Sequence, residues 1–396
     1  MRRGTRDSRD GMALLLALLF VAVLSAIVIE YAYETQVEAS LAGNRAADLE
    51  AYVAAKSGIA NGMALLAGDL LEFELYIGRD FDSLIDLWAM GFQMQPINNA
   101  IMRCSIDDEY GKINLNALIA MDENGVIVEN ELLIGTLRMF FEMRMQMFDL
   151  EENPTDAILD WLDPDSEPRE FGAESDWYAA LEIPYPCKNG PMDSIDELLM
   201  VFGITPELYF AILDDPSQNQ PNKMFSSSKK QSKPVPGMPG MPGLPGMPGG
   251  GRGGAQAQQG LDMLPLPELL TVHGSPRGLI NVNTAEPEVL DALFQIWPLA
   301  DPTDVELILT RQMDQLPFMD MGEVAGLFGK GQKGDWPPED VLTVKSDVFR
   351  LFGDGQSEEV RVRIEAYVWR NPGQGMTDTG GGAMEAFRIL DWRVIR

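Results

Sequence analysis

An uncharged apolar segment lies near the start of the chain. Residues 12–29 read MALLLALLFVAVLSAIVI, and four arginines precede them within residues 1–11. A membrane-spanning helix needs about 20 apolar residues, and a basic flank favours keeping that end in the cytoplasm. The pattern therefore predicts a single membrane-spanning helix whose amino-terminal side is cytoplasmic.

Helical spacing continues beyond this segment. Residues 30–67 contain no proline and many alanines, and a set of mostly apolar residues recurs at steps of three or four. These residues are Val37, Leu41, Leu49, Tyr52, Lys56, Ile59, Met63 and Leu66. Such spacing is typical of one face of a long amphipathic helix. We therefore expect one helix over residues 12–68.

Strand patterns flank a long helical region. The segments rich in β-branched and aromatic residues are 100–106, 341–349, 359–369 and 386–395. Strict alternation from Val360 predicts a half-buried strand, and the Gly353–Gly355 segment predicts the turn before it. Residues 115–338 read mostly as helices, among them residues 131–148. The sequence thus predicts a helical domain between strands.

The composition excludes several classes of function. The chain of 396 residues has 30 Lys and Arg against 61 Asp and Glu, a net charge of −31, with one His and two Cys. A nucleic-acid partner is not expected, because phosphates need a basic surface. Cysteine and histidine are too few for a Cys₄ or Cys₂His₂ zinc site. No nucleophile motif accompanies His273, and no phosphate-binding loop is present, so we do not expect an enzyme.

Two segments, residues 192–213 and 280–309, resemble helix-hairpin-helix units. In DNA-binding proteins such hairpins offer backbone amides to phosphates. Here the second segment carries several acids, among them Glu286, Glu288 and Asp291. This charge opposes DNA binding, so we expect a structural or protein-contact role.

The densest cluster of charge lies in residues 149–176, where eleven acids are opposed only by Arg169. Counted from Asp163, acids occupy the first, third, fifth and twelfth positions, as in an EF-hand calcium loop. Pro168 stands where an EF-hand needs glycine, so the spacing favours a calcium loop of another geometry. The alternative is an acidic surface without metal. The candidate ligands are Asp160, Asp163, Asp165, Glu167, Glu174 and Asp176.

The short charged segment before the apolar helix resembles a class III prepilin leader. Such a leader is cut by a prepilin peptidase after its glycine, which here is Gly11, so that Met12 becomes the first residue. Most pilins have Glu at the fifth mature position, which here is Leu16. The lack of Glu at this position is a feature in which the chain resembles one minor subunit of type II secretion systems.

Four further motifs narrow the resemblance. They are DEYGKINLNAL (108–118), DWLDPDSEPREFGAESDWY (160–178), MDSIDELLMVFGIT (192–205) and INVNTAEPEVLDAL (280–293). With the leader, they are similar to the K-type minor pseudopilins of the general secretory pathway. The resemblance covers most of the chain apart from a Gly- and Pro-rich insert near residues 217–262.

The resemblance implies an α+β, pilin-like fold: a long amino-terminal helix and an antiparallel β-sheet with a large, mostly α-helical domain inserted. The expected divisions are a leader (1–11), the helix (12–68), a β domain (69–114 and 339–396) and the insert (115–338, with a flexible loop at 216–262). The family also binds calcium in the acidic segment, which implies the same here.

The resemblance further implies an inner-membrane anchor with a periplasmic carboxy-terminal part. The implied place is the tip of the pseudopilus, beside the I- and J-type minor pseudopilins and above the major pseudopilin. At the tip, Leu16 in place of the usual Glu suits a subunit that initiates or caps assembly for protein export. The bulky insert suits the same role. The alternatives are a minor pilin of a type IV pilus and a membrane-anchored calcium-binding periplasmic module.

Two cysteines, Cys104 and Cys187, complete the candidate chemistry. In an oxidising periplasm a disulfide is permitted. It would close a long loop and hold the acidic segment against the β domain, and the alternative is two separate buried thiols. The sequence leaves both possibilities open.

Overall fold

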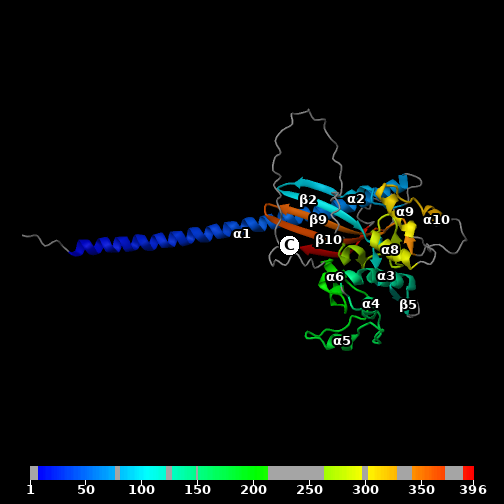
Figure 1. The fold of residues 1–396 in the computed structure, drawn as a ribbon. Coiled ribbons are helices and arrows are strands. Elements are labelled where there is room, and N and C mark those ends of the chain that lie inside the picture. Colours follow the sequence, from blue (N-terminus) through cyan, green and yellow to red (C-terminus); the bar gives the residue numbers. More distant parts are fainter. Residues whose placement is uncertain are drawn as a thin grey trace, which may run out of the picture.

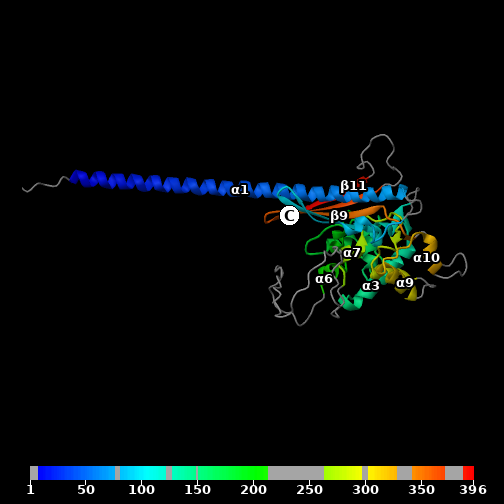
Figure 2. The same cartoon turned by 90° about the horizontal axis from the view of Figure 1, so that it is seen from above.

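Three layers make up the globular part. The computed structural model describes residues 8–75, 81–121, 127–148, 150–212, 263–296, 302–327, 341–370 and 387–396. The second half of a long helix, α1 (Ser8–Leu75), covers one face of a five-stranded sheet, and the helices of the insert lie on the opposite side of the sheet (Figures 1 and 2). The predicted class, a helix and antiparallel sheet with a helical insert, is confirmed. The predicted loop at 216–262 and leader residues 1–7 lie outside the described residues.

The first half of α1 extends away from the globular part (Figure 1). The helix begins at Ser8 and ends at Leu75, so it is longer at both ends than the predicted 12–68. Every side chain from Leu14 to Ala46 is exposed. The part of this stretch up to Ile29 is uncharged and apolar, and such an exposed surface is unfavourable in water; by length and composition this helix can cross a membrane.

The face of α1 that packs on the sheet matches the predicted one only in part, at Ile59, Met63 and Leu66. Its buried residues are mostly small: Ala47, Ala51, Ala54, Ala55, Ile59, Met63, Leu66 and Ala67. Leu41 and Leu49 were predicted on this face but are 50% and 62% exposed. Periodicity alone ranked large side chains above alanine, whereas close approach of helix and sheet requires small ones.

The sheet has the order β1-β2-β9-β10-β11, with every neighbouring pair antiparallel. Its strands are β1 (Phe92–Ile97), β2 (Ala100–Asp108), β9 (Val348–Ser357), β10 (Val360–Arg370) and β11 (Phe387–Ile395). Asp108 at the end of β2 pairs with Phe349 at the start of β9. The insert therefore leaves and re-enters the sheet at one end of two neighbouring strands.

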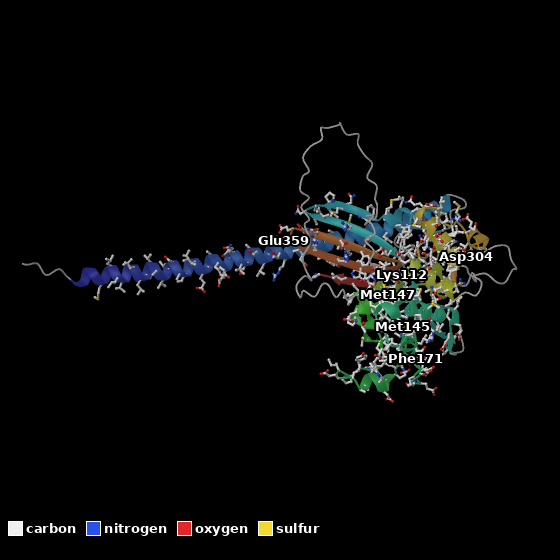
Figure 3. All side chains as sticks on the ribbon, in the orientation of Figure 1. Lys112, Met145, Met147, Phe171, Asp304 and Glu359 are labelled. Carbon is white, nitrogen blue, oxygen red and sulfur yellow. The ribbon has the colours of Figure 1, made fainter. Side chains whose placement is uncertain are left out.

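The predicted turn at Gly353–Gly355 is wrong, because both glycines lie within β9. The turn between β9 and β10 is at Glu358 and Glu359, and Figure 3 shows Glu359 at the end of the sheet where α1 leaves the globular part. A Cβ on Gly355 would lie 1.9 Å from the carbonyl oxygen of Ala51 on α1. The glycines are thus required for helix packing and not for chain reversal.

The insert is built from short elements, with α3 matching the helix predicted at residues 131–148. The elements between β2 and β9 are η1 (Glu109–Gly111), β3 (Ile113–Asn114), η2 (Leu115–Ala117), β4 (Ile119–Met121), β5 (Ile127–Glu129), α3 (Glu131–Phe148), α4 (Thr155–Leu162), α5 (Ser175–Ala179), η3 (Ile195–Met200), α6 (Pro206–Phe210), α7 (Leu266–Leu269), β6 (Leu270–Thr271), β7 (Ile280–Asn281), α8 (Pro287–Gln295), α9 (Pro302–Met313), α10 (Met321–Leu327) and β8 (Leu342–Thr343). A further short helix, α2 (Leu87–Met90), precedes β1.

Two main hydrophobic cores are present in the described part of the chain. One lies between α1 and the sheet and includes Ile59, Trp88 and Phe349. The larger one lies within the insert and also includes Phe81 and Val344, which flank the predicted insert of 115–338.

The cysteines belong to different cores. Cys104 lies on β2 in the core beneath α1, and Cys187 lies in the core of the insert. Both are buried and free in the structure, which favours two separate thiols over a bridge between them. Each thiol instead fills space as a small apolar group.

Candidate metal centre

The first candidate ligand of the acidic segment, Asp160, lies on a fully buried helix. Every residue of α4 (Thr155–Leu162) is buried, and the backbone N–H of Asp163 donates to the carbonyl of Leu159 to end the helix. Rings pack beside it, with Trp161 and Tyr178 5.3 Å apart between centroids. Asp160 and Asp163 are therefore held on rigid backbone at the edge of the insert core.

A loop then leads to α5, whose first residue is preceded by Glu174. This loop brings Asp163, Asp165 and Glu174 together, with one carboxylate oxygen from each lying within 4.8 Å of the others. Asp163 and Glu174 are buried and Asp165 is exposed. Figure 3 labels Phe171 of this loop, which lies on the side of the insert away from the sheet.

Three buried oxygen atoms around this cluster lack hydrogen-bond partners among the described residues. They are Oδ1 of Asp163, Oε1 of Glu174 and Oδ1 of Asn189. The side-chain amide of Asn189 donates to the backbone carbonyl of Asp165, which places it at the cluster. A buried oxygen without a donor is costly unless something else binds it, so the donor set suits a cation.

Asn189 was not among the predicted ligands. It lies fifteen residues beyond Glu174 in the sequence and reaches the site through the fold of the insert, where the N–H of Gly190 donates to the carbonyl of Trp161 (3.3 Å). An Asn-Gly pair after the acidic segment was the available signal, since amide oxygens are calcium ligands.

The remaining candidates do not join the cluster. Asp160 is fully buried and its carboxylate accepts from the Arg169 side chain at 2.7 Å and from the Arg169 backbone N–H at 3.1 Å. Glu167 and Asp176 are exposed, and neither belongs to the group of converging oxygens. Spacing along the sequence placed these acids near one another but could not give the direction of each side chain.

Burial shapes the electrostatics of the cluster. It raises the pKa of Glu174, and the charges of Asp160 and Asp163 raise it further, while the backbone N–H of Ser175 opposes the shift. A cation would relieve this repulsion. Carboxylate and amide oxygens, without sulfur or imidazole, are the donors of a hard ion such as Ca²⁺.

Comparison with known proteins shows which family the region around this site resembles. Residues 111–214, which contain the whole acidic cluster, match the family model described as type II secretion system (T2SS), protein K. The chain thus carries a domain that matches the type II secretion system protein K family. A protein of this name from Pectobacterium carotovorum subsp. carotovorum is 28% identical over 213 residues, which cover 52% of this chain and 62% of the relative. The corresponding protein of Pseudomonas aeruginosa is 28% identical over 208 residues, covering 51% and 58%.

A solved structure extends the likeness to the whole fold. A chain of the GspK-GspI-GspJ complex from the enterotoxigenic Escherichia coli type 2 secretion system matches with a TM-score of 0.51 and 18% identity, covering 92% of this chain and 99% of that one. The pilin-like fold with an inserted helical domain predicted from the protein K resemblance is therefore confirmed. The sequence matches span about 60% of the relatives' lengths.

Proposed function

We propose that this chain is a minor pseudopilin at the tip of the type II secretion pseudopilus, where it initiates or caps assembly. The observation that carries this proposal is the combination of an exposed apolar helix, long enough to cross a membrane, with a protein K domain on the other side of the sheet from that helix. Its role is structural rather than enzymatic. Partners of the I and J types follow from the complex in which the structural relative was solved.

Processing tests the membrane part of the proposal. The expected mature amino terminus is Met12, released by the prepilin peptidase after Gly11 at the inner membrane. Amino-terminal sequencing of the protein from cells checks this, with a Gly11→Val variant as the uncleaved control. An intact leader on the wild type would instead favour a simple membrane-anchored periplasmic module.

The insert provides the test of capping. Because Asp108 and Phe349 pair at one end of the sheet, residues 109–348 can be replaced by an Asn-Gly hairpin turn that keeps the β2–β9 register. We expect this variant to change the number or length of pseudopili assembled with the major pseudopilin. A second variant, Leu16→Glu with the insert intact, supplies the charge that most pilins carry at the fifth mature position. Pseudopili of normal number and length without the insert would refute capping.

We also propose that the acidic cluster binds calcium. Asp163, Asp165, Glu174 and Asn189 would hold the ion, and their unpartnered buried oxygens support this fit. Bound calcium would neutralise the carboxylates and fix the loop before α5. The full chain in detergent should melt at a higher temperature in calcium chloride than in EDTA, and Glu174→Gln should abolish the difference. An unchanged melting temperature for the wild type would refute the calcium site.

A further inference from the structure

The acidic loop carries one cation of its own, the guanidinium of Arg169. Its Nη1 lies 2.7 Å from Oδ1 of Asp160 and also contacts Oδ2 of Asp163, and its Nη2 lies 2.7 Å from Oε1 of Glu129 on β5. Only 25% of the Arg169 side chain is exposed. One guanidinium therefore joins the end of α4, the loop and the β4–β5 hairpin.

Asp163 divides its two oxygens between this guanidinium and the cluster. Oδ2 contacts Arg169, whereas Oδ1 is buried without a partner among the described residues and belongs to the carboxylate that converges with Asp165 and Glu174. Arg169 is thus one carboxylate away from the site proposed for calcium. Its charge acts on the same Asp163 group that a metal ion would need.

The contacts of Arg169 also explain how the loop keeps its shape. Its backbone N–H donates to Asp160, and Gly172 lies so close to the Asp160 carboxylate that a Cβ there would meet Oδ2 at 1.8 Å. Four acids of the loop region, Asp160, Asp163, Asp165 and Glu174, would otherwise repel each other without compensation. The guanidinium neutralises part of this charge in the absence of metal.

We propose that Arg169 is a built-in counter-ion of the metal centre, which keeps the loop folded without calcium and weakens calcium binding. This inference rests on the calcium site proposed above. The number of charges around a calcium loop sets its affinity over several decades, and a fixed positive charge beside one ligand lowers that affinity. Through Glu129, Arg169 also links the loop to the β4–β5 hairpin. Loss of Arg169 therefore removes the ion pair that holds the loop and the hairpin together.

The test compares Arg169→Gln, Arg169→Lys and wild type as full-length protein in detergent. Calcium affinity is measured by calorimetric titration with calcium chloride, and the melting temperature is measured in EDTA and in saturating calcium. We expect Arg169→Gln to bind calcium about tenfold more tightly, because one opposing charge is removed. Its melting temperature should fall in EDTA and return toward the wild-type value in calcium.

Arg169→Lys separates charge from geometry. Lysine keeps the charge but cannot bridge three carboxylates, so its calcium affinity should stay near the wild-type value while its melting temperature in EDTA falls. Arg138→Gln is the matched control, since Arg138 of α3 pairs with Asp156 of α4 at 2.7 Å without belonging to the cluster. This control should leave calcium affinity unchanged.

The outcomes separate the two proposals. Weaker calcium binding by Arg169→Gln, or equal affinity for the Gln and Lys variants, would overturn the counter-ion role while the calcium site stands. A fall in melting temperature that is the same in EDTA and in calcium would also overturn it. A wild type that does not bind calcium would refute both the calcium site and the role of Arg169.

Discussion

Packing of α1 on the sheet depends on two glycines of β9, and Gly355→Ala is the sharpest perturbation of it. A Cβ at Gly355 would lie 1.9 Å from the Ala51 carbonyl oxygen and 2.6 Å from the Ala55 backbone nitrogen. Both contacts are with helix backbone, which cannot rotate away as a side chain would. Since real Cβ contacts are essentially never below 3.0 Å, helix and strand must separate by about 1.1 Å at this point.

The cost follows from the size of that separation. A gap of 0.5–1 Å already removes a quarter to a half of the dispersion energy between facing atoms. The facing atoms belong to the core that contains Ile59, Leu66 and Phe349. Overpacking of a well-filled core lowers the free energy of unfolding by about 1–3 kcal/mol. Because the contacts here are with backbone, we expect Gly355→Ala to lower it by about 3 kcal/mol.

Hydrogen exchange with mass spectrometry on the full chain in detergent is the appropriate assay, because it reports each core separately. Amides of α1 from Ala47 to Leu66 should exchange faster in Gly355→Ala, while those of α3 stay protected. Gly43→Ala is the matched control, because no atom lies within 4 Å of a Cβ built there. Alanine should stabilise the helix at that position by up to about 1 kcal/mol. Unchanged protection of α1 in Gly355→Ala would refute the close packing of helix and sheet.

Three further changes test other parts of the fold. In Gly172→Ala the new Cβ would lie 1.8 Å from the Asp160 carboxylate, so the loop should move away and the melting temperature in EDTA should fall. A melting temperature equal to that of the wild type would contradict this packing. Burial raises the pKa of Asp108 to about 6, against hydrogen bonds from hydroxyl groups. Between pH 4 and 6 the folded state then holds more protons than the unfolded state, so the free energy of unfolding should fall as the pH rises, by up to about 1.4 kcal/mol per unit. Asp108→Asn should reduce this slope in urea titrations at several pH values, while Asp69 and Asp82, whose pKa values burial also raises, keep their part of it; an unchanged slope would contradict the contribution of Asp108. Glu288→Ala should lower the free energy of unfolding by about 2 kcal/mol, because it removes the carboxylate that pairs with the buried Arg144 at 2.6 Å. Urea unfolding measures this loss, and a loss below about 0.5 kcal/mol would contradict the argument.

The elements with a strong period were predictable from sequence. The helix at residues 131–148 and the strand beginning at Val360 are where alternation and helical spacing placed them. Gly353 and Gly355 were misread as a turn, because glycine also serves where two backbones come close, and only the partner helix reveals this. The same close approach explains why most of the α1 residues that face the sheet are alanines.

Prediction of the metal centre was partial for a related reason. Loop spacing identified Asp163, Asp165 and Glu174 because a loop of that length can bring its own ends together. Asp160 carries the same charge, but its place on α4 directs it to Arg169. Asn189 is supplied by a different part of the insert, so the spacing of the acids could not reveal it, and the Asn-Gly pair was the one signal.

The junction between the sheet and the insert shows what the INVNTA segment does in this fold. The side chain of Asn281 donates to the Asp82 carbonyl (3.2 Å) and to Oδ2 of Asp108 (3.2 Å), and the hydroxyl of Ser346 donates to the same Asp108 oxygen at 2.6 Å. Arg370 of β10 then reaches Asp82 at 2.6 Å.

These groups are buried and come from the insert, from the end of β2, from β10 and from the segment after α1. Buried polar networks that are largely satisfied hold their elements in one arrangement, because any shift leaves several groups unpaired. The hairpin-like segment is therefore used for internal docking, in keeping with its acidic surroundings. A pseudopilin whose insert is fixed to the sheet in this way presents a rigid obstacle beside its own helix, which is the property that the proposed cap requires.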